Sequence, residues 1–173
     1  SYTAQAQKTA CRGERVIGKP SSALGQCMNR GVTGILFKCK GEQIDEYLLP
    51  SIRGERKNAF ALTEPGAGSD ARAIVTKAER NGNGWVLNGV KQFISAADIA
   101  DFIILIAVSG IDQTEKGPRK RFTAFLLDKD LPGLRVEPMK SIVTRGYNTT
   151  MVYLDNVHAV SYTHLRAHET RED

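Results

Sequence analysis

Residues 60–71 read FALTEPGAGSDA, an apolar run followed by a proline, two glycines spaced by one residue, and a Ser-Asp pair. Gly66, Gly68 and Ala71 match the pattern GxGxxA, which lets a backbone approach a nucleotide phosphate closely. A dinucleotide-binding fold would need these glycines to open a helix, then a parallel strand and an acidic residue about 20 positions further on. The flanking residues test whether that fold is present.

The residues after the turn do not continue as a dinucleotide-binding unit. The run at 74–76 (IVT) is β-branched, Asn81–Gly84 interrupts the chain soon afterwards, and residues 85–92 contain no Asp or Glu. A glycine-rich turn can instead hold an anion through successive backbone N–H groups, without any helix. Ser69 would add a hydroxyl donor to such a site.

The residues before the turn extend this second interpretation. Phe60–Thr63 presents alternating faces, so one side could lie along an apolar ring while Thr63 bonds its polar edge. A plain hairpin turn without a ligand is an equal alternative on glycine spacing alone, because short motifs often match by chance.

From residue 58 onward the sequence alternates with a period of two, as in half-buried strands. Asn83-Gly84 and Asn88-Gly89 favour the backbone angles of tight hairpins. About seven short, closely spaced strands predict an antiparallel β barrel or sandwich. The predicted strands are Ile74–Arg80, Trp85–Leu87, Val90–Ile94, Ala100–Val108, Arg121–Asp128, Leu134–Pro138 and Thr149–Asp155.

The fold class predicted for the whole chain is an α+β fragment, with remnant helices in 1–57 and the β domain in 58–160. Segment 42–52 has apolar residues at positions 44, 48 and 52, which predicts a helix that Pro50 ends or kinks. Residues 161–173 turn abruptly polar and are interpreted as a tail that is not native to the fold.

Bulk composition is that of a globular chain, with 41% hydrophobic and 25% charged residues among 173. The longest apolar run, Phe102–Val108, is far shorter than the roughly 18 residues that suggest a membrane span. Residues 1–15 contain no secretory signal, so we expect a cytoplasmic protein without stable membrane insertion. The basic cluster Lys116–Arg121 is interpreted as a solvated loop and not as a nucleic-acid site.

Neither cysteine nor histidine spacing predicts a metal site. The three cysteines, Cys11, Cys27 and Cys39, form no CxxC motif, and their odd number argues against a disulfide framework. Reduced thiols are therefore expected. His164 and His168 have the i, i+4 spacing of zinc ligands on a helix, but no third ligand accompanies them.

Several longer strings resemble the acyl-CoA dehydrogenase family. They are LTEPGAGSD, KAERNGNGWVLNGVKQFISAADIADFIILIA, FTAFLLDKDLPGLRVE and MVYLDNVHAV, and the resemblance runs from about Gly41 to Val160. It implies an N-terminal helical domain, a middle β domain and a C-terminal four-helix domain, with FAD as cofactor and a homotetramer in most members. It also implies oxidation of an acyl-CoA to the trans-2-enoyl-CoA, with electrons passed to an electron-transfer flavoprotein.

The resemblance implies roles for particular residues. Phe60–Ser69 corresponds to the first FAD-binding stretch, in which Thr63 meets the polar rim of the flavin and Ser69 lies near the pyrophosphate and the CoA thioester. Phe93-Ile94-Ser95 corresponds to the second stretch, usually Trp-Ile-Thr, which packs on the isoalloxazine. Ordinary core packing is the alternative for Phe93 and Ile94. The expected FAD-binding residues are Phe60, Ala61, Leu62, Thr63, Gly68, Ser69, Phe93, Ile94 and Ser95, and Ser69 is also expected to bind substrate.

The implied reaction needs a carboxylate base to remove the α-proton. The resemblance places that base on a Glu of the C-terminal domain, which this sequence does not reach. Glu64, beside Pro65 and the glycine turn, is expected to bond local N–H groups as a structural carboxylate. No catalytic residue is therefore expected here, and the chain alone is predicted to be inactive and to aggregate or bind FAD weakly. The alternative is a non-catalytic FAD- or acyl-CoA-binding or structural β domain.

Overall fold

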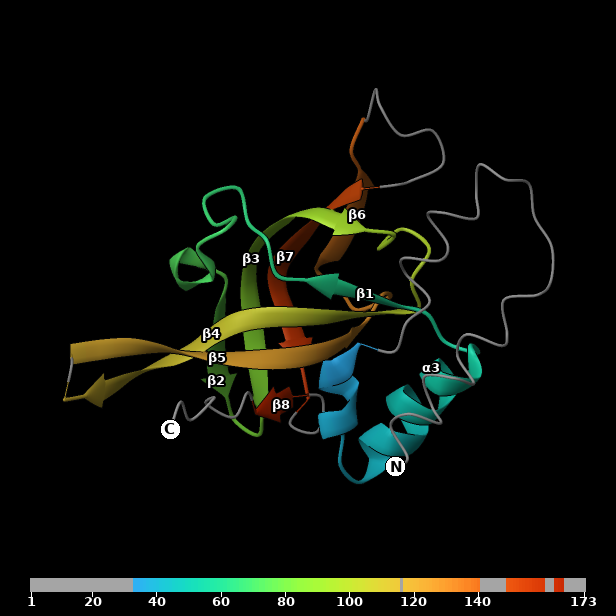
Figure 1. The fold of residues 1–173 in the computed structure, drawn as a ribbon, viewed down its shortest axis with the longest axis horizontal. Helices are drawn as coiled ribbons and strands as arrows, with labels where there is room; N and C mark the ends of the chain where they lie inside the picture. Colours follow the sequence, from blue (N-terminus) through green and yellow to red (C-terminus); the bar gives the residue numbers. More distant parts are fainter. Residues whose placement is uncertain (1–32, 116, 141–148, 161–163, 167–173) are drawn as a thin grey trace.

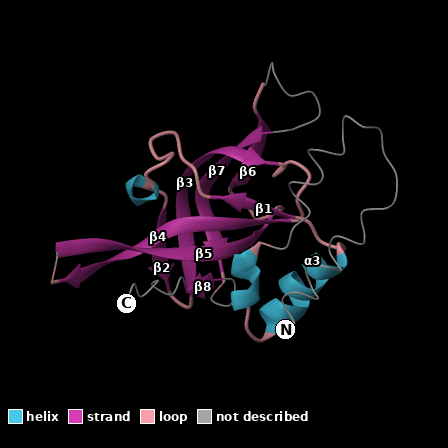
Figure 2. Ribbon diagram, in the orientation of Figure 1, coloured by secondary structure: helices cyan, strands magenta, loops and turns pink. Residues whose placement is uncertain are grey.

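The computed structural model describes residues 33–115, 117–140, 149–160 and 164–166 (Figure 1). In this part of the chain a short helical region lies beside a strongly curled β-sheet (Figure 2). The predictions made for Cys11, Cys27 and His168, and for the helical remnant before residue 33, fall outside the described residues.

The helical region has three short pieces, η2 (Gly34–Lys38), η3 (Ile44–Leu48) and α3 (Leu49–Arg53). The last two run directly into each other, so the helix predicted over 42–52 is confirmed. Pro50 does not end it, because the helix widens into a π-helical turn at η3 before the proline and then continues through α3.

A side chain replaces the hydrogen bond that Pro50 cannot donate. Proline has no N–H for the carbonyl four residues earlier in a helix. Here the Arg56 Nη1 group donates to that carbonyl oxygen, on Glu46, at 3.0 Å. The Arg56 guanidinium also lies over the rings of Tyr47 and Phe102, 4.9 and 5.1 Å from their centroids. The helix end is thereby held against the sheet.

The apolar positions that predicted this helix do face the sheet, but they are not its most buried ones. Ile44 and Leu48 are half-buried and pack against an apolar cluster on the sheet, whereas Gln43, Tyr47 and Ser51 are buried. Tyr47 makes an edge-on contact with the ring of Phe102, with centroids 5.0 Å apart. This contact buries a large apolar ring, which contributes more to the packing of the helix than an aliphatic side chain would.

Eight strands of the described residues form one mixed sheet in the order β6-β7-β3-β2-β4-β5-β8, with β1 paired to β4. The prediction of an antiparallel sheet is right for most pairs, but β1 and β2 each run parallel to β4. Neither is joined to β4 by a hairpin, so neither connection forces antiparallel pairing. The strands are β1 (Asn58–Ala61), β2 (Lys77–Asn81), β3 (Gly84–Ser95), β4 (Phe102–Thr114), β5 (Gly117–Asp128), β6 (Leu134–Pro138), β7 (Thr149–Ala159) and β8 (His164–Arg166).

One of the two predicted Asn-Gly hairpins is wrong. The β2–β3 hairpin before Gly84 forms as expected, with Asn81 paired to Gly84. Asn88 and Gly89, in contrast, lie at a register shift inside a continuous β3. Gly89 has a φ of +153°, and a Cβ built there would lie 2.5 Å from Thr76 Oγ1. Glycine is needed at this bulge because another segment passes close to the backbone.

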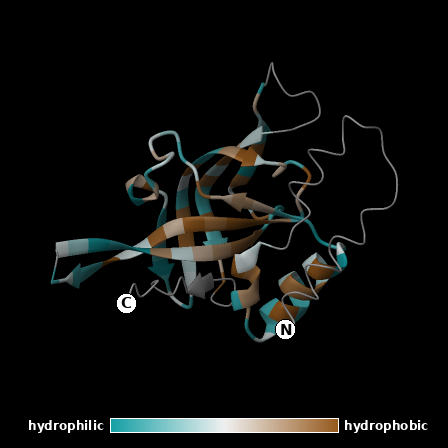
Figure 3. Cartoon of the chain, in the orientation of Figure 1, coloured by the Kyte–Doolittle hydropathy of each residue, from teal (hydrophilic) through white to brown (hydrophobic). Residues whose placement is uncertain are grey.

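Strands β4 and β5 extend well beyond their predicted ends into a two-stranded ribbon that projects from the sheet (Figure 1). The basic cluster predicted as a loop lies largely in this ribbon. Residues 118–121 belong to β5 and are exposed, so their solvation is confirmed although their conformation is a strand. The hydropathy colouring turns polar towards the end of the ribbon (Figure 3).

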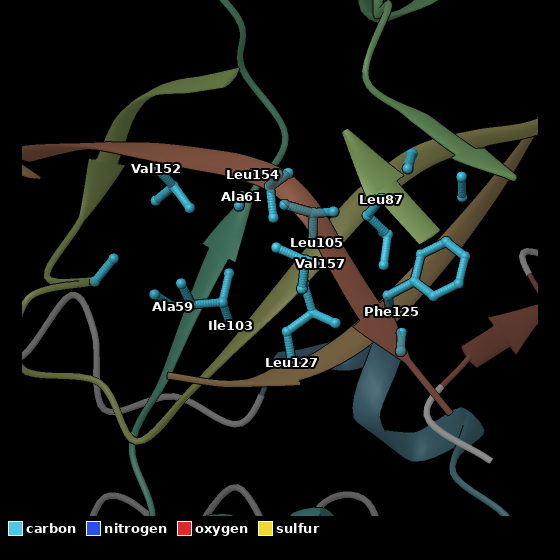
Figure 4. Packing of buried hydrophobic residues seen from close by; sticks show 14 of the residues in the cluster. Ala59, Ala61, Leu87, Ile103, Leu105, Phe125, Leu127, Val152, Leu154 and Val157 are labelled. Atoms are coloured by element: carbon cyan, nitrogen blue, oxygen red, sulfur yellow. The ribbon is translucent and has the colours of Figure 1, made fainter. Parts of the chain in front are cut away.

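The first half of β4, from Phe102 to Ala107, is buried on both faces. Ile103, Leu105 and Ala107 belong to the main cluster inside the curled sheet (Figure 4), together with Phe125 of β5. The alternate residues Phe102, Ile104 and Ile106 pack in a second cluster against the helical region. The uninterrupted apolar run that predicted a buried strand therefore reflects two packing partners, since a strand covered on one face would alternate.

The polar tail predicted to lie outside the fold is partly on the sheet. His164–Arg166 forms β8, which pairs antiparallel with β5. The interpretation of 161–173 as a non-native segment stays a prediction.

Candidate functional site

The glycine-containing turn begins just after β1. Glu64 N donates to the Ala67 carbonyl oxygen at 3.0 Å, and Ala67 N donates to the Glu64 carbonyl oxygen at 3.1 Å. These two bonds close a four-residue turn with Gly66 near its tip. Ala67 is buried beneath the turn, whereas Gly66, Gly68 and Ser69 are exposed. The turn therefore presents its glycine backbone and a hydroxyl to the outside.

Neither glycine is required by the protein's own conformation. Gly66 and Gly68 do not have positive φ angles, so their backbone conformation does not call for glycine. No described protein atom lies within 4 Å of a Cβ built at either position. The missing side chains leave open space beside the backbone, as close approach of a ligand requires.

The turn does not lead into a helix that could direct a dipole at a phosphate. The Asp70 side chain accepts the Arg72 N–H at 2.9 Å, which caps the three-residue 3-10 helix η4 (Ala71–Ala73). The chain then stays irregular until β2. The dinucleotide-binding alternative needs an α-helix opened by the glycines, and in the described residues only the three-residue η4 follows them before β2.

The Glu64 carboxylate is committed to structural bonds, as predicted. Its two oxygens accept the N–H groups of Val75 and Thr76 at 2.7 and 3.0 Å. Lys91 Nζ donates to Glu64 Oε1 at 2.8 Å. Burial by itself would raise the pKa of Glu64, but hydrogen bonds from Lys91, Thr76 and Val75 outweigh it and hold that pKa below its ordinary value. Glu64 is thus a fixed anion, poorly suited to accept a proton from a substrate.

The second predicted stretch forms a bulge at the end of β3. The pairing of β3 with β7 shifts register between Lys91 and Ile94. Phe93, inside the shift, has a φ of +58°, which is unusual for a bulky residue. The residue is 58% exposed, so the core-packing alternative is wrong for Phe93. That alternative is right for Ile94, which is buried in the main cluster.

The two stretches lie next to each other in the fold. Gln92 N donates to the Thr63 carbonyl oxygen at 2.8 Å, and Lys91 Nζ donates to the Leu62 carbonyl oxygen at 3.0 Å. Segments separated by about 30 residues in the sequence therefore form one continuous surface region. Phe60, at 39% exposure, and Phe93 are both large apolar residues that remain exposed in this region.

Not every predicted residue offers its side chain to a ligand. Ala61 and Ile94 are buried in the main cluster, so only their backbone atoms are accessible to a ligand (Figure 4). Leu62 packs against the cluster on the helical side. Thr63 and Ser95 are half-buried, whereas Gly68 and Ser69 are exposed.

The sequence prediction missed Lys91, although the pattern of β3 carried a signal for it. Trp85 and Leu87 are buried, and the alternation continues through Gly89 to position 91. A lysine at an inward position of a strand is rarely buried without a charged partner. The inward position of Lys91 in this pattern could therefore have prompted a search for a buried acid. In the structure its side chain is fully buried beside Glu64.

The described residues contain no group of three or more His, Cys, Asp or Glu side chains arranged to hold a metal ion. Cys39 is a free, buried cysteine, and burial raises the pKa of its thiol to about 11, which disfavours a reactive thiolate. No helix in the described part of the chain is long and apolar enough to cross a membrane.

Comparison with known proteins finds a family model and relatives that match this chain. The family model described as the acyl-CoA dehydrogenase middle domain matches residues 59–157. A 3-(aryl)acrylate reductase of Clostridium sporogenes is 39% identical over 142 residues, which cover 82% of this chain and 35% of the relative. An (R)-benzylsuccinyl-CoA dehydrogenase of Thauera aromatica is 46% identical over 116 residues, covering 66% of this chain and 28% of the relative.

A solved structure has the same fold. The butyryl-CoA dehydrogenase of Megasphaera elsdenii superposes with a TM-score of 0.72 at 27% identity, covering 83% of this chain and 38% of that chain. The chain thus spans about a third of the length of the relatives that it matches.

Proposed function

The chain belongs to the acyl-CoA dehydrogenase family, and we propose that it forms the flavin- and thioester-binding part of an enzyme acting on the Cα–Cβ bond of an acyl-CoA. The sequence-based predictions of the family and of FAD as its cofactor are confirmed at the level of the family. The substrate, the reaction direction and the residue roles below are proposals.

One observation carries the proposal for this chain: the two predicted FAD-binding stretches meet through the bond between Gln92 N and the Thr63 carbonyl oxygen. Beside that junction, Gly66 and Gly68 leave open space that the protein itself does not fill. Phe93 is exposed although it is a large apolar residue, and it has a backbone angle that is unfavourable for its residue type. These features fit a planar aromatic ring linked to phosphates.

We assign the accessible groups to different parts of FAD. The exposed amides of the glycine turn and the Ser69 hydroxyl would bind the pyrophosphate, and Ser69 would also face the CoA thioester. Thr63 would bond the polar rim of the ring system, and Ser95 would donate near its reactive nitrogen. Phe93 would pack on the ring face, and Phe60 would cover apolar surface beside it.

Bound FAD would supply the redox chemistry, accepting a hydride from the β-carbon of the acyl group. The chain's own residues orient the ring and the thioester, and exclude water from one side of them. They do not supply the base, because three hydrogen bonds occupy Glu64. The base is proposed to be a Glu in a C-terminal helical domain, where it removes the α-proton to give a trans-2-enoyl-CoA.

The partners follow from the same proposal. Electrons leave through an electron-transfer flavoprotein, and the active protein is a homotetramer. The isolated 173-residue chain is proposed to be inactive. A non-catalytic FAD- or acyl-CoA-binding or structural domain is the alternative of a different class.

A second candidate concerns the direction of the reaction and the acyl group. One relative is named a reductase of 3-(aryl)acrylate, and another is a dehydrogenase of benzylsuccinyl-CoA. Both names describe aryl-substituted chains, and the first describes addition of hydrogen. We therefore propose an aryl-substituted acyl group as the substrate, with reduction of a 3-arylacryl group as the competing direction.

Flavin absorption of the full-length protein tests these alternatives. We expect a flavin spectrum that 3-phenylpropionyl-CoA bleaches under anaerobic conditions more completely than butyryl-CoA does. If reduction is the working direction, 3-phenylacryloyl-CoA will instead reoxidise the chemically reduced protein rapidly. A colourless protein that takes up no added FAD contradicts the proposal. Bound flavin that responds to no acyl- or enoyl-CoA supports the non-catalytic alternative.

A further inference from the structure

A fully buried ion pair lies directly behind the junction of the two stretches. The Lys91 and Glu64 side chains are 0% and 2% exposed, and their Nζ and Oε1 atoms are 2.8 Å apart. Strand alternation points Lys91 inward, and the turn directly after β1 brings Glu64 to it. Neither charge reaches solvent, so neither contributes to solubility or to long-range attraction of a ligand.

The pair connects three segments of backbone. Lys91 Nζ also donates to the Leu62 carbonyl oxygen, at 3.0 Å. Glu64 also accepts the N–H groups of Val75 and Thr76. Every bond is directional and links a side chain to a defined backbone atom or to the opposite charge. Together they fix the end of β1, the segment leading into β2 and the start of the β3 bulge relative to one another.

Stability alone is a weak explanation for such a pair. Desolvating two charges offsets much of their attraction, and well-packed apolar residues in their place are often as stabilising or more so. A buried pair does restrict the geometry of the groups that bond to it, which is its better-attested use. The residues restricted here adjoin the proposed ligand contacts: Thr63 precedes Glu64, and Phe93 lies two residues after Lys91.

We propose that Glu64 and Lys91 are positioning residues that hold the 60–69 turn and the 91–95 bulge in register for the flavin. The inference rests on the proposed function, but it concerns residues that are not expected to touch the ligand. The pair fixes where the Thr63 and Phe93 groups lie. The bond between Gln92 N and the Thr63 carbonyl oxygen joins the two segments on the side of the proposed ligand.

The test compares two single variants with a double variant in the full-length protein. Lys91→Met and Glu64→Gln each remove one partner, and Glu64→Gln/Lys91→Met removes both charges. Phe125→Leu is the matched control, since it destabilises the apolar core without bonding to either stretch. FAD affinity, the visible flavin spectrum and the melting temperature are measured for each variant. Hydrogen exchange is followed in peptides that contain Val75–Thr76 and Gln92.

We expect the double variant to regain most of the melting temperature lost in Lys91→Met, yet to bind FAD at least tenfold more weakly than the original protein and with an altered spectrum. Phe125→Leu should lower the melting temperature while leaving affinity and spectrum unchanged. A merely structural pair would restore affinity together with stability. FAD affinity that follows melting temperature across all four variants would therefore overturn the proposal. Should Lys91→Met fail to fold, Glu64→Gln, which keeps the side-chain volume, replaces it.

Hydrogen exchange separates this inference from the proposed function. If the original protein binds no FAD, the proposed function fails, but the exchange measurements still test the pair. Faster exchange at Val75–Thr76 and Gln92 in Glu64→Gln, without the same change in Phe125→Leu, supports the pair as the element that holds the two stretches. Exchange at these amides that does not differ between the two variants overturns it.

Discussion

Two parts of the interior are equally buried but are held together by different forces. Around Phe125 the sheet packs apolar side chains, with the Trp85 ring meeting Phe125 edge-on at 5.6 Å. Around Glu64 and Lys91 the same sheet buries opposite charges joined by short hydrogen bonds. Apolar packing is non-directional and stabilises the fold as a whole. The ion pair is directional, so it places particular atoms, and it lies beside the proposed ligand site.

The largest expected effect tests the apolar side of this comparison. Phe125→Ala removes a fully buried ring and should lower the free energy of unfolding by about 3–5 kcal/mol. Urea unfolding followed by the fluorescence of Trp85, the single tryptophan, measures the change. FAD bound per folded molecule should be unchanged. A loss of stability below about 1 kcal/mol would mean that the cluster repacks around the cavity.

The next largest effect is expected at the buried ion pair of Glu64 and Lys91. Lys91→Met leaves the Glu64 carboxylate buried without its cation and should lower the free energy of unfolding by about 3 kcal/mol. The lower end of the known range applies because two backbone N–H groups still bond that carboxylate. In the same urea experiment, Glu64→Gln/Lys91→Met should be more stable than Lys91→Met alone. A double variant whose loss equals the sum of the single losses would show that the two residues act independently.

A smaller effect is expected at Gly89, where the segment that contains Thr76 passes close to the backbone of β3. Gly89→Ala places a Cβ 2.5 Å from Thr76 Oγ1 at a φ of +153° and should lower the free energy of unfolding by about 1–3 kcal/mol. Gly34→Ala is the matched control, since no described atom lies within 4 Å of its Cβ and its φ is not positive. Thermal unfolding by circular dichroism compares the two. Equal melting temperatures would mean that the Thr76 segment moves aside freely.

The smallest expected effect is a pH dependence. The pKa of Glu64 is lowered on folding, so its contribution to stability is present above the ordinary value of 4.5 and is lost as pH falls below that value. The loss is at most about 1.4 kcal/mol per pH unit for one group. Burial lowers the pKa of Lys91, but Lys91 is protonated in both states in acid and adds nothing there. Glu64→Gln should flatten the acid side of the stability profile, and an unchanged profile would contradict this assignment.

The sequence predicted the parts of the fold that depend on local pattern. The run from Ala100 to Val108 predicted a buried strand, and Leu134–Pro138 predicted a strand that is found with the same bounds. Asn88-Gly89 predicted a hairpin that does not form. Glycine is needed there because Thr76, thirteen residues earlier, leaves no room for a Cβ atom. A local rule cannot distinguish a hairpin glycine from one that admits a crossing segment.

The sequence likewise predicted only part of the candidate site. The residue pattern and the family resemblance predicted the structural role of Glu64 and pointed to the two stretches that are proposed to bind the ligand. They did not identify Lys91 as the partner of Glu64, the exposure of Phe93, or the contact between Thr63 and Gln92. Each of these depends on pairing between segments about 30 residues apart, or on a bulge that turns a side chain outward.

By itself the sequence determined the family, the strand-rich class and the positions of the two stretches that are proposed to bind the ligand, because these follow from residue identity and from periodicity along the chain. Only the tertiary structure decided which face of each stretch is free and what holds the stretches together. Burying Lys91 is acceptable only when the fold brings Glu64 and the Leu62 carbonyl oxygen within hydrogen-bond distance. The packing of distant segments meets that requirement, and no residue next to Lys91 in the sequence does.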